Sequence, residues 1–335
     1  MEAQDQTAAL LTQAAGFVGA KVIEMGLVHG LLESINDAGE STPAQLAENV
    51  GIDPFYSGVW CRAAYASGVL EGHDGGSYQL AAHMETLLLD HSSPAYIGGL
   101  FKVLNQPEMF PTFSNNLHSG ERIWWDQTGP GWIAGVTETG GAFNTRFIPA
   151  GIRQVPGVDE RLRGGGRALE LACGTGVGLI RLATHYPDVQ LVGLDGDAYS
   201  LRTARSRIDD AGLSDRIQLW HSPMEDLEAE AEFDVVTINI SMHECRDIEG
   251  VTSAIHRALK PGGFFVNSDF PLPESGEGFR TVPGRIMAGV SCFEALIDAQ
   301  LLSKSDYVEL MERHGFDGVG SVDLTPVHAI TFGTK

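Results

Sequence analysis

The sequence predicts an α/β protein in which a doubly wound, mostly parallel sheet follows a mainly helical N-terminal domain. Two observations lead to this fold class. From Arg167 onward, short apolar runs typical of strands alternate with segments that have helical spacing. Before that point, signals for helix starts dominate and only two short strand-like runs occur. A chain of 335 residues is long for one domain, so two domains are the natural expectation.

Residues 1–94 are expected to form a helical unit that ends in a small hairpin. An apolar helix with few charges is predicted over Ala8–Leu32, so much of its surface should be buried. Two further helices, Pro43–Val50 and Pro54–Ala66, each begin with proline at an early helical position. Two short strands around a glycine turn follow them, Val69–Glu71 and Tyr78–Leu80. Helix, turn, helix and hairpin in this order are the outline of a winged-helix domain.

Residues 95–160 are rich in aromatic side chains and interrupted by Gly and Pro, so short helices and loops are expected there. We interpret this region as a linker or lid. Its aromatic residues, together with two residues after the fifth strand of the following domain, are candidates for the wall of an acceptor pocket. Packing in the core is the alternative that such residues more often take. The candidates are Trp124, Trp125, Phe147, Met287 and Phe293.

Residues 161–335 alternate between strand and helix patterns, which favours a parallel sheet covered by helices on both faces. The predicted strands are Ala168–Ala172, Gln190–Asp195, Ile217–His221, Asp234–Ile240, Gly263–Phe270 and Ala329–Gly333. The predicted helices between them are Gly178–His185, Tyr199–Ala211, Glu249–Leu259 and Lys304–His314. The last strand follows Ser321–Leu324, which is compatible with an antiparallel hairpin at the end of the sheet.

A glycine-rich loop follows the first strand of this sheet and opens a helix. Gly174 and Gly176 allow positive φ and a close approach of a ligand to the backbone. Asp195 ends the next strand, where a carboxylate accepts hydrogen bonds from the ribose of a bound nucleoside. A dinucleotide fingerprint would place glycine at Leu179, whereas this chain has G-x-G-x-G and a carboxylate, Glu170, in the strand. A carboxylate there suits S-adenosylmethionine, which carries an ammonium, a sulfonium and no phosphate.

These segments together resemble the class I S-adenosylmethionine-dependent methyltransferases. The stretch from Glu170 to Gly176 is similar to the first motif of that family, Val192–Asp195 to the second, and Leu259–Gly263 to the turn before the fifth strand. The resemblance implies a seven-stranded Rossmann-like sheet and S-adenosylmethionine as cofactor. The cofactor-binding residues that it implies are Glu170, Ala172, Gly174, Gly176, Asp195, Gly196, Ser222, Pro223, Met224 and Asn239. The alternatives are glycines that only pack strand on helix, and a nicotinamide-dependent dehydrogenase.

The charges argue against nucleic acid as a partner. The formal net charge is -22, and Lys21 and Arg62 are the only strong bases among residues 1–90. A DNA-binding domain needs several basic contacts to phosphate. The N-terminal domain instead resembles the dimerisation domain of caffeate-type and bacterial small-molecule O-methyltransferases, which implies a homodimer. The apolar helix Ala8–Leu32 fits such an interface, and burial within one chain is the alternative.

The remaining composition predicts a cytoplasmic protein that does not bind membranes. The four cysteines are scattered without C-x-x-C spacing, which is typical of reduced thiols rather than of a disulfide framework or a zinc site. The first residues lack the basic region of a signal peptide. We also expect no apolar run of the ~18–20 residues that span a bilayer.

His243 is the outstanding candidate for catalysis. It follows the fourth strand, and ligands of doubly wound sheets bind at the carboxyl ends of strands. Its segment resembles the His-Asp-Trp-Ser-Asp stretch of the caffeate-type family, which implies that His243 is a general base with Glu244 beside it. Cys245 and Arg246 depart from that pattern. The alternatives are a histidine that caps a helix or lines the pocket, and a ligand of iron or zinc, as in related methyltransferases acting on 2-oxo acids.

No metal is predicted, because no other histidine sits at metal-ligand spacing from His243.

The predicted reaction is methyl transfer from S-adenosylmethionine to a small, aromatic acceptor in secondary metabolism. Oxygen is favoured as the accepting atom, since a phenol with a pKa near ~10 gains from a histidine base. Methylation of carbon, in an indole ring or a 2-oxo acid, is the alternative. A regulator that senses S-adenosylmethionine through its winged helix is the non-enzyme alternative, and it lacks the basic helix it would need.

Overall fold

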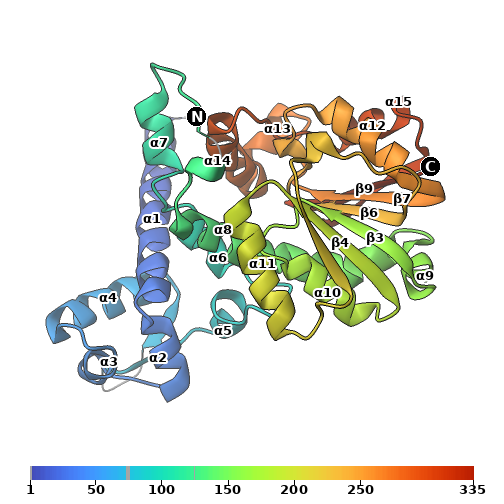
Figure 1. Cartoon of the computed structure of the whole chain (residues 1–335). Helices are drawn as coiled ribbons and strands as arrows, with labels where there is room; N and C mark the ends of the chain where they lie inside the picture. Colours follow the sequence, from blue (N-terminus) through green and yellow to red (C-terminus); the bar gives the residue numbers. More distant parts are fainter. Residues whose placement is uncertain (1, 73–75, 124) are drawn as a thin grey trace. The chain divides into compact units, whose positions relative to one another are not determined.

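The computed structural model describes residues 2–72, 76–123 and 125–335. The chain divides into two compact units, Met1–Gln106 and Pro107–Lys335, which are considered separately below (Figure 1). The first unit is mainly helical, and the second contains the large sheet.

The predicted helices and the two short strands of the first unit occur in the predicted order. The helices Leu31–Ala38 and Met84–Leu88 were not predicted, and Gly98–Val103 falls in the region where short helices were expected. Thr42 caps a helix by accepting a hydrogen bond from the backbone N–H of Gln45, and Asp53 caps the next helix in the same way. The two short strands pair antiparallel. The elements of this unit are α1 (Ala3–Val28), α2 (Leu31–Ala38), α3 (Pro43–Val50), α4 (Pro54–Ala66), β1 (Leu70–Gly72), β2 (Tyr78–Leu80), α5 (Met84–Leu88) and α6 (Gly98–Val103).

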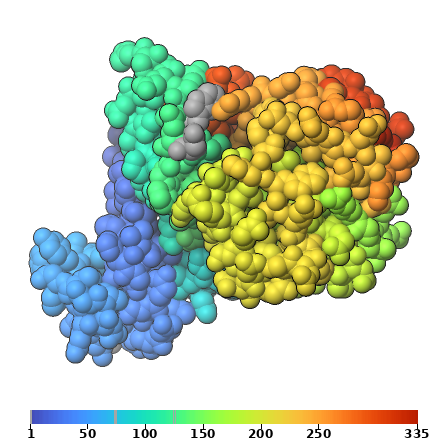
Figure 2. All heavy atoms as spheres, viewed as in Figure 1, coloured from blue at the N-terminus to red at the C-terminus, as the bar shows by residue number. Residues whose placement is uncertain are grey.

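Helix α1 differs from the prediction in its length and in its burial. The predicted helix Ala8–Leu32 is broken at Gly30, whose φ of 67° lies in the left-handed region. Much of its surface is exposed in the single chain, which contradicts burial within one chain and leaves the dimer interface as a prediction. Leu10 is 70% exposed and Phe17 is 66% exposed, and Figure 2 shows the blue side chains of α1 on the molecular surface.

By length and composition α1 also qualifies as a membrane span, with a mean hydropathy of 1.2 over 18 residues. The expectation that no apolar run has this length is therefore wrong. Core helices of soluble proteins and signal sequences share this property.

The segment between residue 107 and the sheet is more helical than predicted. Only short helices were expected there, but α8 extends from Pro130 to Arg146. Proline at its first position removes a backbone donor that would lack a partner anyway. The elements are α7 (Phe110–Asn116), η1 (Trp125–Gln127), α8 (Pro130–Arg146), η2 (Phe147–Gly151), η3 (Ile152–Gln154) and α9 (Val158–Arg163).

The second unit is built on a seven-stranded sheet with the order β5-β4-β3-β6-β7-β9-β8. The first five strands of this order are parallel, and β9 runs antiparallel to both of its neighbours. The predicted α/β fold class and the terminal hairpin are thereby confirmed. The strands are β3 (Gly166–Leu171), β4 (Val189–Asp195), β5 (Ile217–His221), β6 (Phe233–Asn239), β7 (Leu259–Asp269), β8 (Asp317–Thr325) and β9 (His328–Thr334).

Helices cover both faces of this sheet (Figure 1). Side chains of α10 (Val177–His185) and α11 (Ala198–Asp210) form one apolar layer with the sheet. Side chains of α12 (Ile248–Ala258) and α15 (Lys304–Arg313) form the other. The long connection after β7 contains α13 (Gly276–Arg280) and α14 (Val282–Leu296).

The strand order reverses between β3 and β6, which are neighbours in the sheet. Ligands of such sheets bind at the carboxyl ends of the strands beside this switch point. The site is therefore expected where β3, β4 and β6 end.

Candidate functional site

The glycine loop between β3 and α10 has the backbone that the sequence predicted. Gly174 has a φ of 50° and Gly176 a φ of 79°, and both angles favour glycine. Ala172 also has positive φ, at 49°, which is uncommon for a residue with a side chain. The loop N–H of Gly174 donates to Oδ2 of Asp195 at 2.7 Å. The structure thus joins the two segments that the sequence analysis paired.

Glu170 lies beneath this loop with only 4% of its surface exposed. Its Oε2 has no hydrogen-bond partner in the part of the chain that the structure describes. A Cβ atom on Gly178, the third glycine of the motif, would collide with this carboxylate. Burial, with the negative charge of Asp195 as a second cause, raises the pKa of Glu170 to about 8. A buried carboxylate without a partner favours a cation, so these residues fit the ammonium group of S-adenosylmethionine.

The loops after β4 and β5 lie side by side. The backbone N–H of Ser222 donates to the carbonyl of Asp195 at 3.1 Å. An ideal Cβ on Gly196 would lie 3.6 Å from Cα of Pro223. Met224 follows directly and begins a short helical turn, η4 (Met224–Asp226). The residues predicted to flank adenine are therefore gathered next to the carboxylate predicted to bind ribose.

Asn239 ends β6 and is held by polar side chains from two other elements. Its Nδ2 donates to Oδ1 of Asn144 in α8 at 3.3 Å, and its Oδ1 accepts from Ser268 in β7 at 2.8 Å. Helix α8 also reaches the glycine loop, because the hydroxyl oxygens of Thr137 and Thr175 are 3.4 Å apart. The sequence analysis missed these contacts of α8, since no motif marks Asn144 or Thr137.

His243 lies in the short turn η5 (Met242–Glu244) after β6 and is only 3% exposed. Its Nδ1 lies 2.7 Å from Oδ1 of Asp269 at the end of β7. Asp269 also accepts hydrogen bonds from the hydroxyl of Tyr307 and from the backbone N–H of Phe270, both at 2.8 Å. Burial alone would raise the pKa of Asp269, but the charge of His243 and these hydrogen bonds lower it. An ionised Asp269 accepts a hydrogen bond from Nδ1–H and thereby fixes the orientation of the ring.

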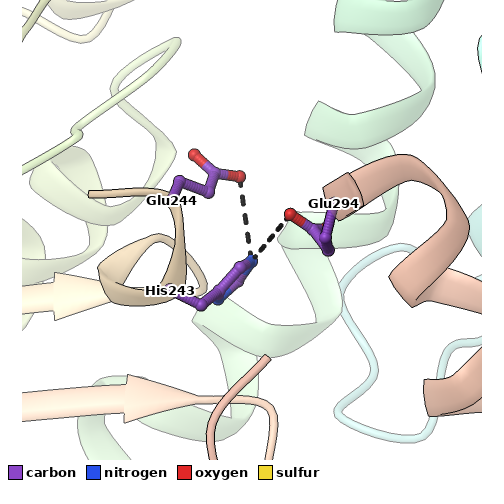
Figure 3. A group of neighbouring side chains, drawn as sticks. All are labelled: His243, Glu244 and Glu294. Atoms are coloured by element: carbon purple, nitrogen blue, oxygen red, sulfur yellow. Dashed lines mark ion pairs between the residues drawn. The ribbon is translucent and has the colours of Figure 1, made fainter. Parts of the chain in front are cut away.

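The other ring nitrogen of His243 faces two glutamates (Figure 3). Nε2 lies 3.4 Å from Oε2 of Glu294 and 3.9 Å from Oε1 of Glu244. Glu294 comes from α14 and is 4% exposed. Burial raises the pKa of Glu244 well above its usual range. The charge of His243 lowers this pKa, but the carboxylates of Glu294, Asp269 and Asp195 raise it further.

Sequence reasoning predicted His243 and Glu244 but missed the residues that surround them. Asp269 is an acid at the carboxyl end of a strand, which is a signal that the sequence contains. No signal marks Glu294 or Tyr307, because each lies in a helix far along the chain.

The predicted acceptor-pocket residues are only partly brought together. The ring centroid of Phe293 lies 5.5 Å from that of Trp125 and 4.1 Å from that of Trp132. Trp124 lies outside the described residues. Phe147 is fully buried in the core under the sheet, so the packing alternative holds for this residue.

Met287 occupies a different apolar cluster, with Phe143 and Phe270. The ring of Phe270 lies 5.6 Å from that of His243. Met287 thus shares a cluster with the phenylalanine that packs near the histidine ring, and it is not part of the Trp125 group.

Known proteins match this chain in sequence and in fold. Residues 168–263 match the family model for a methyltransferase domain. The ubiquinone/menaquinone biosynthesis C-methyltransferase UbiE of Geobacter sp. (strain M21) is 30% identical over 190 residues, which cover 52% of this chain and 80% of that protein. The matched family region includes the glycine loop, Asp195 and His243.

Solved structures match nearly the whole chain. The mitomycin 7-O-methyltransferase MmcR has a TM-score of 0.73 and 17% identity, with 99% of this chain and 98% of that chain covered. Human N-acetylserotonin methyltransferase, solved in complex with S-adenosylmethionine, has a TM-score of 0.72 and 15% identity, with 100% and 99% covered. At these identities the structures establish a shared fold.

Proposed function

We propose that this chain, which belongs to the class I S-adenosylmethionine-dependent methyltransferases, methylates an oxygen atom of a small aromatic molecule in secondary metabolism. Its reaction is methyl transfer and its cofactor is S-adenosylmethionine. Glu170 and the backbone of Gly174 and Gly176 would hold the methionine part of the cofactor, and Asp195 would hold the ribose. The bound cofactor supplies a methyl group on a sulfonium, which is already a good leaving group.

The observation that carries the choice of oxygen is Nε2 of buried His243, which forms no hydrogen bond within the described part of the chain. A protonated hydroxyl is a poor nucleophile, so the enzyme must orient it, exclude water and remove its proton. Since Asp269 holds Nδ1 of His243, Nε2 points away from Asp269 toward Glu244 and Glu294 (Figure 3). With Nε2 free of other ligands, His243 accepts the proton of the acceptor hydroxyl, and Glu244 lies beside the reacting oxygen.

The carboxylates around His243 favour the protonated form of its ring. Burial alone lowers the pKa of His243, but Asp269 and Glu294 outweigh burial and raise it well above its usual range. Only the neutral fraction of His243 can therefore act as the base, and the protonated ring that results is stabilised by these carboxylates. The rings of Trp125 and Phe293 support a flat acceptor, because aromatic side chains stack on planar molecules. The name of MmcR, a 7-O-methyltransferase of similar fold, agrees with oxygen as the accepting atom.

The test is His243→Ala, assayed with S-adenosylmethionine labelled in its methyl group against phenols, indoles and 2-oxo acids. We expect cofactor affinity within about twofold of wild type and turnover reduced by roughly 10²–10⁴-fold, the range for loss of a general base. His256→Ala is the matched control, because His256 lies in α12 and its ring packs on Phe316. Unchanged turnover of His243→Ala would remove this role for the residue.

Methylation of carbon is the second candidate. It is favoured by the 30% identity to a C-methyltransferase over most of that protein's length. The same screen separates the two, because a methyl ether and a new carbon–carbon bond differ in the mass fragments and carbon shifts of the product.

We further propose that two copies of the chain associate through α1 in the cytoplasm, without nucleic acid or membrane as a partner. The support is the run of exposed apolar side chains on α1, together with the resemblance of this unit to a dimerisation domain. The acidic balance of the chain argues against DNA. A gel shift at low salt tests that part, and specific DNA binding would favour the regulator that senses S-adenosylmethionine.

A further inference from the structure

We propose that His243, Glu244 and Glu294 form a binding site for one divalent metal ion. One ligand atom of each residue lies within 4.8 Å of the other two. Two atoms bound to the same ion at ~2.0–2.2 Å lie roughly 3.0–3.5 Å apart. The separation of 3.4 Å between His243 Nε2 and Glu294 Oε2 already fits, and Glu244 Oε1 at 3.9 Å needs only a small side-chain movement.

The two ligand atoms that lie 3.4 Å apart, one on His243 and one on Glu294, form no hydrogen bond with the rest of the described chain. These atoms, Nε2 of His243 and Oε2 of Glu294, are buried. Figure 3 shows the imidazole and both carboxylates converging on one point. Leaving such groups unpaired is costly, so a bound species that satisfies both is expected.

The charge of the cluster also favours a cation. Three carboxylates, those of Glu244, Asp269 and Glu294, surround a single imidazole. None of them forms an ion pair with a lysine or arginine that the structure describes. Buried charges are normally paired or bind a metal, and here the negative charges exceed the positive ones.

Asp269 contacts the ring nitrogen of His243 that does not face the proposed ion. Histidines that bind metals usually donate their second ring N–H to a carboxylate, which orients the ring and makes the first nitrogen a stronger ligand. Asp269 holds Nδ1 of His243 in this way, and it is itself held by Tyr307. The ligands therefore have the outer support that metal sites require.

One imidazole and two carboxylates are the donor set of zinc, iron(II) or manganese(II) rather than of copper(I), which prefers sulfur, or of calcium, which prefers oxygen alone. Three protein ligands leave at least one position open. We infer that the acceptor oxygen binds at this open coordination position, and this part of the inference rests on the proposed function. An ion held there would lower the pKa of the acceptor hydroxyl, whose proton would leave to water. Nε2 would then be a ligand, so the ion would replace His243 as the group that activates the hydroxyl. The oxygen forms its bond to the methyl carbon as the bond to sulfur breaks, and that electron pair stays on sulfur.

Metal binding can be measured without any knowledge of the acceptor. Full-length protein is stripped with a chelator and titrated by calorimetry with zinc sulfate, manganese chloride or, without oxygen, iron(II) sulfate. Bound metal is counted by mass spectrometry after gel filtration. We expect one ion per chain, and affinity at least tenfold weaker in Glu294→Gln and in Glu244→Gln. Glu309→Gln, which changes an exposed carboxylate in α15, is the matched control and should bind like wild type.

Cofactor affinity of each variant shows that it is folded. The site is wrong if wild type binds less than one ion per chain at submillimolar concentrations, or if Glu294→Gln binds as tightly as wild type. Those results leave the proposed function standing, because His243→Ala still tests it through turnover. Conversely, an ion that binds wild type and is lost in Glu294→Gln supports the site even if the product screen overturns methylation of oxygen.

Discussion

Gly178 lacks a side chain at the place where the carboxylate of Glu170 lies, so the two residues depend on each other. A Cβ atom on Gly178 would collide with Oε1 of Glu170. The backbone of Gly178 is not in the left-handed region, so alanine would be disfavoured by contact and not by backbone strain. The third glycine of the motif is thus explained by packing against the carboxylate that we propose binds the cofactor.

We predict that Gly178→Ala displaces Glu170 and weakens binding of S-adenosylmethionine at least tenfold. The free energy of unfolding should also fall by about 1–3 kcal/mol, as for other overpacked interiors. Calorimetry and denaturant unfolding measure the two effects. Gly140→Ala in α8 is the control, because nothing lies within 4 Å of its added Cβ. That variant should gain about 0.5–1 kcal/mol from lower unfolded-chain entropy. Normal cofactor affinity in Gly178→Ala would show that the contact is unimportant.

Cofactor binding is expected to release a proton from Glu170. Its pKa of about 8 means that most of the carboxyl is protonated near pH 7 in the free protein. The ammonium of the cofactor favours the ionised form, so the bound state holds fewer protons. Affinity should therefore rise with pH between about 6 and 7.5, by up to tenfold per pH unit. Calorimetry in buffers of different ionisation enthalpy measures the released proton. Glu170→Gln should release none, and a pH-independent affinity of wild type would contradict the prediction.

Asp195 anchors the glycine loop, and we propose that it also binds the ribose of the cofactor. It accepts hydrogen bonds from the backbone of Gly174 and of Asp197, at 2.7 and 2.8 Å. We predict that Asp195→Ala weakens binding of S-adenosylmethionine by an order of magnitude or more, because the ribose loses its acceptor and the glycine loop loses its anchor. Calorimetry measures the change. Asp215→Ala, at an exposed position before β5, should bind like wild type, and equal affinity of both variants would refute the role of Asp195.

The sheet and the cofactor side of the site were predictable because their signals are local. The strands around Glu170 and Asp195 are short apolar runs, and the chain turns between them at glycines. Parallel strands then bring their carboxyl ends to one edge, so two segments paired by motif meet in space. The spacing between Gly174 and Asp195 in the sequence was therefore enough to predict that the two residues meet.

The residues that surround His243 were not predictable, because their positions depend on how the helices pack on the finished sheet. Glu294 reaches His243 only because α14 folds back from the long connection after β7. The contacts of α8 with the glycine loop have the same origin, and α8 itself lies in a segment whose helix boundaries the sequence did not mark. Which molecule covers α1 was not predictable for another reason, because its apolar composition does not say whether the same chain or another one does so.

Asp269 is predicted to be a positioning residue for His243. Asp269→Asn keeps the shape of the side chain but places an uncharged amide against Nδ1, which no longer favours the ring state that leaves Nε2 available. We expect turnover to fall by roughly 10²–10⁴-fold, with KM and cofactor affinity changed by less than about threefold. Steady-state kinetics separates kcat from KM. Asp323→Asn, which only breaks an exposed ion pair with Lys304, is the control. A variant that loses cofactor affinity and turnover together would indicate a structural role instead.

The exposed face of α1 gives a prediction about assembly. Leu10, Leu11 and Phe17 are each at least 65% exposed, and a patch of this kind on a soluble protein usually marks an interface. We expect a dimer in sedimentation velocity at micromolar concentration. Leu10→Asp combined with Phe17→Asp should give a monomer, because each charge would have to be buried at the interface. Gln6→Asp, at an exposed polar position of the same helix, should remain dimeric.

Helix α1 is also long and apolar enough to enter a bilayer, so binding of the protein to vesicles is measured as well. A wild-type monomer that sediments with vesicles would assign the surface of α1 to lipid and not to a second chain.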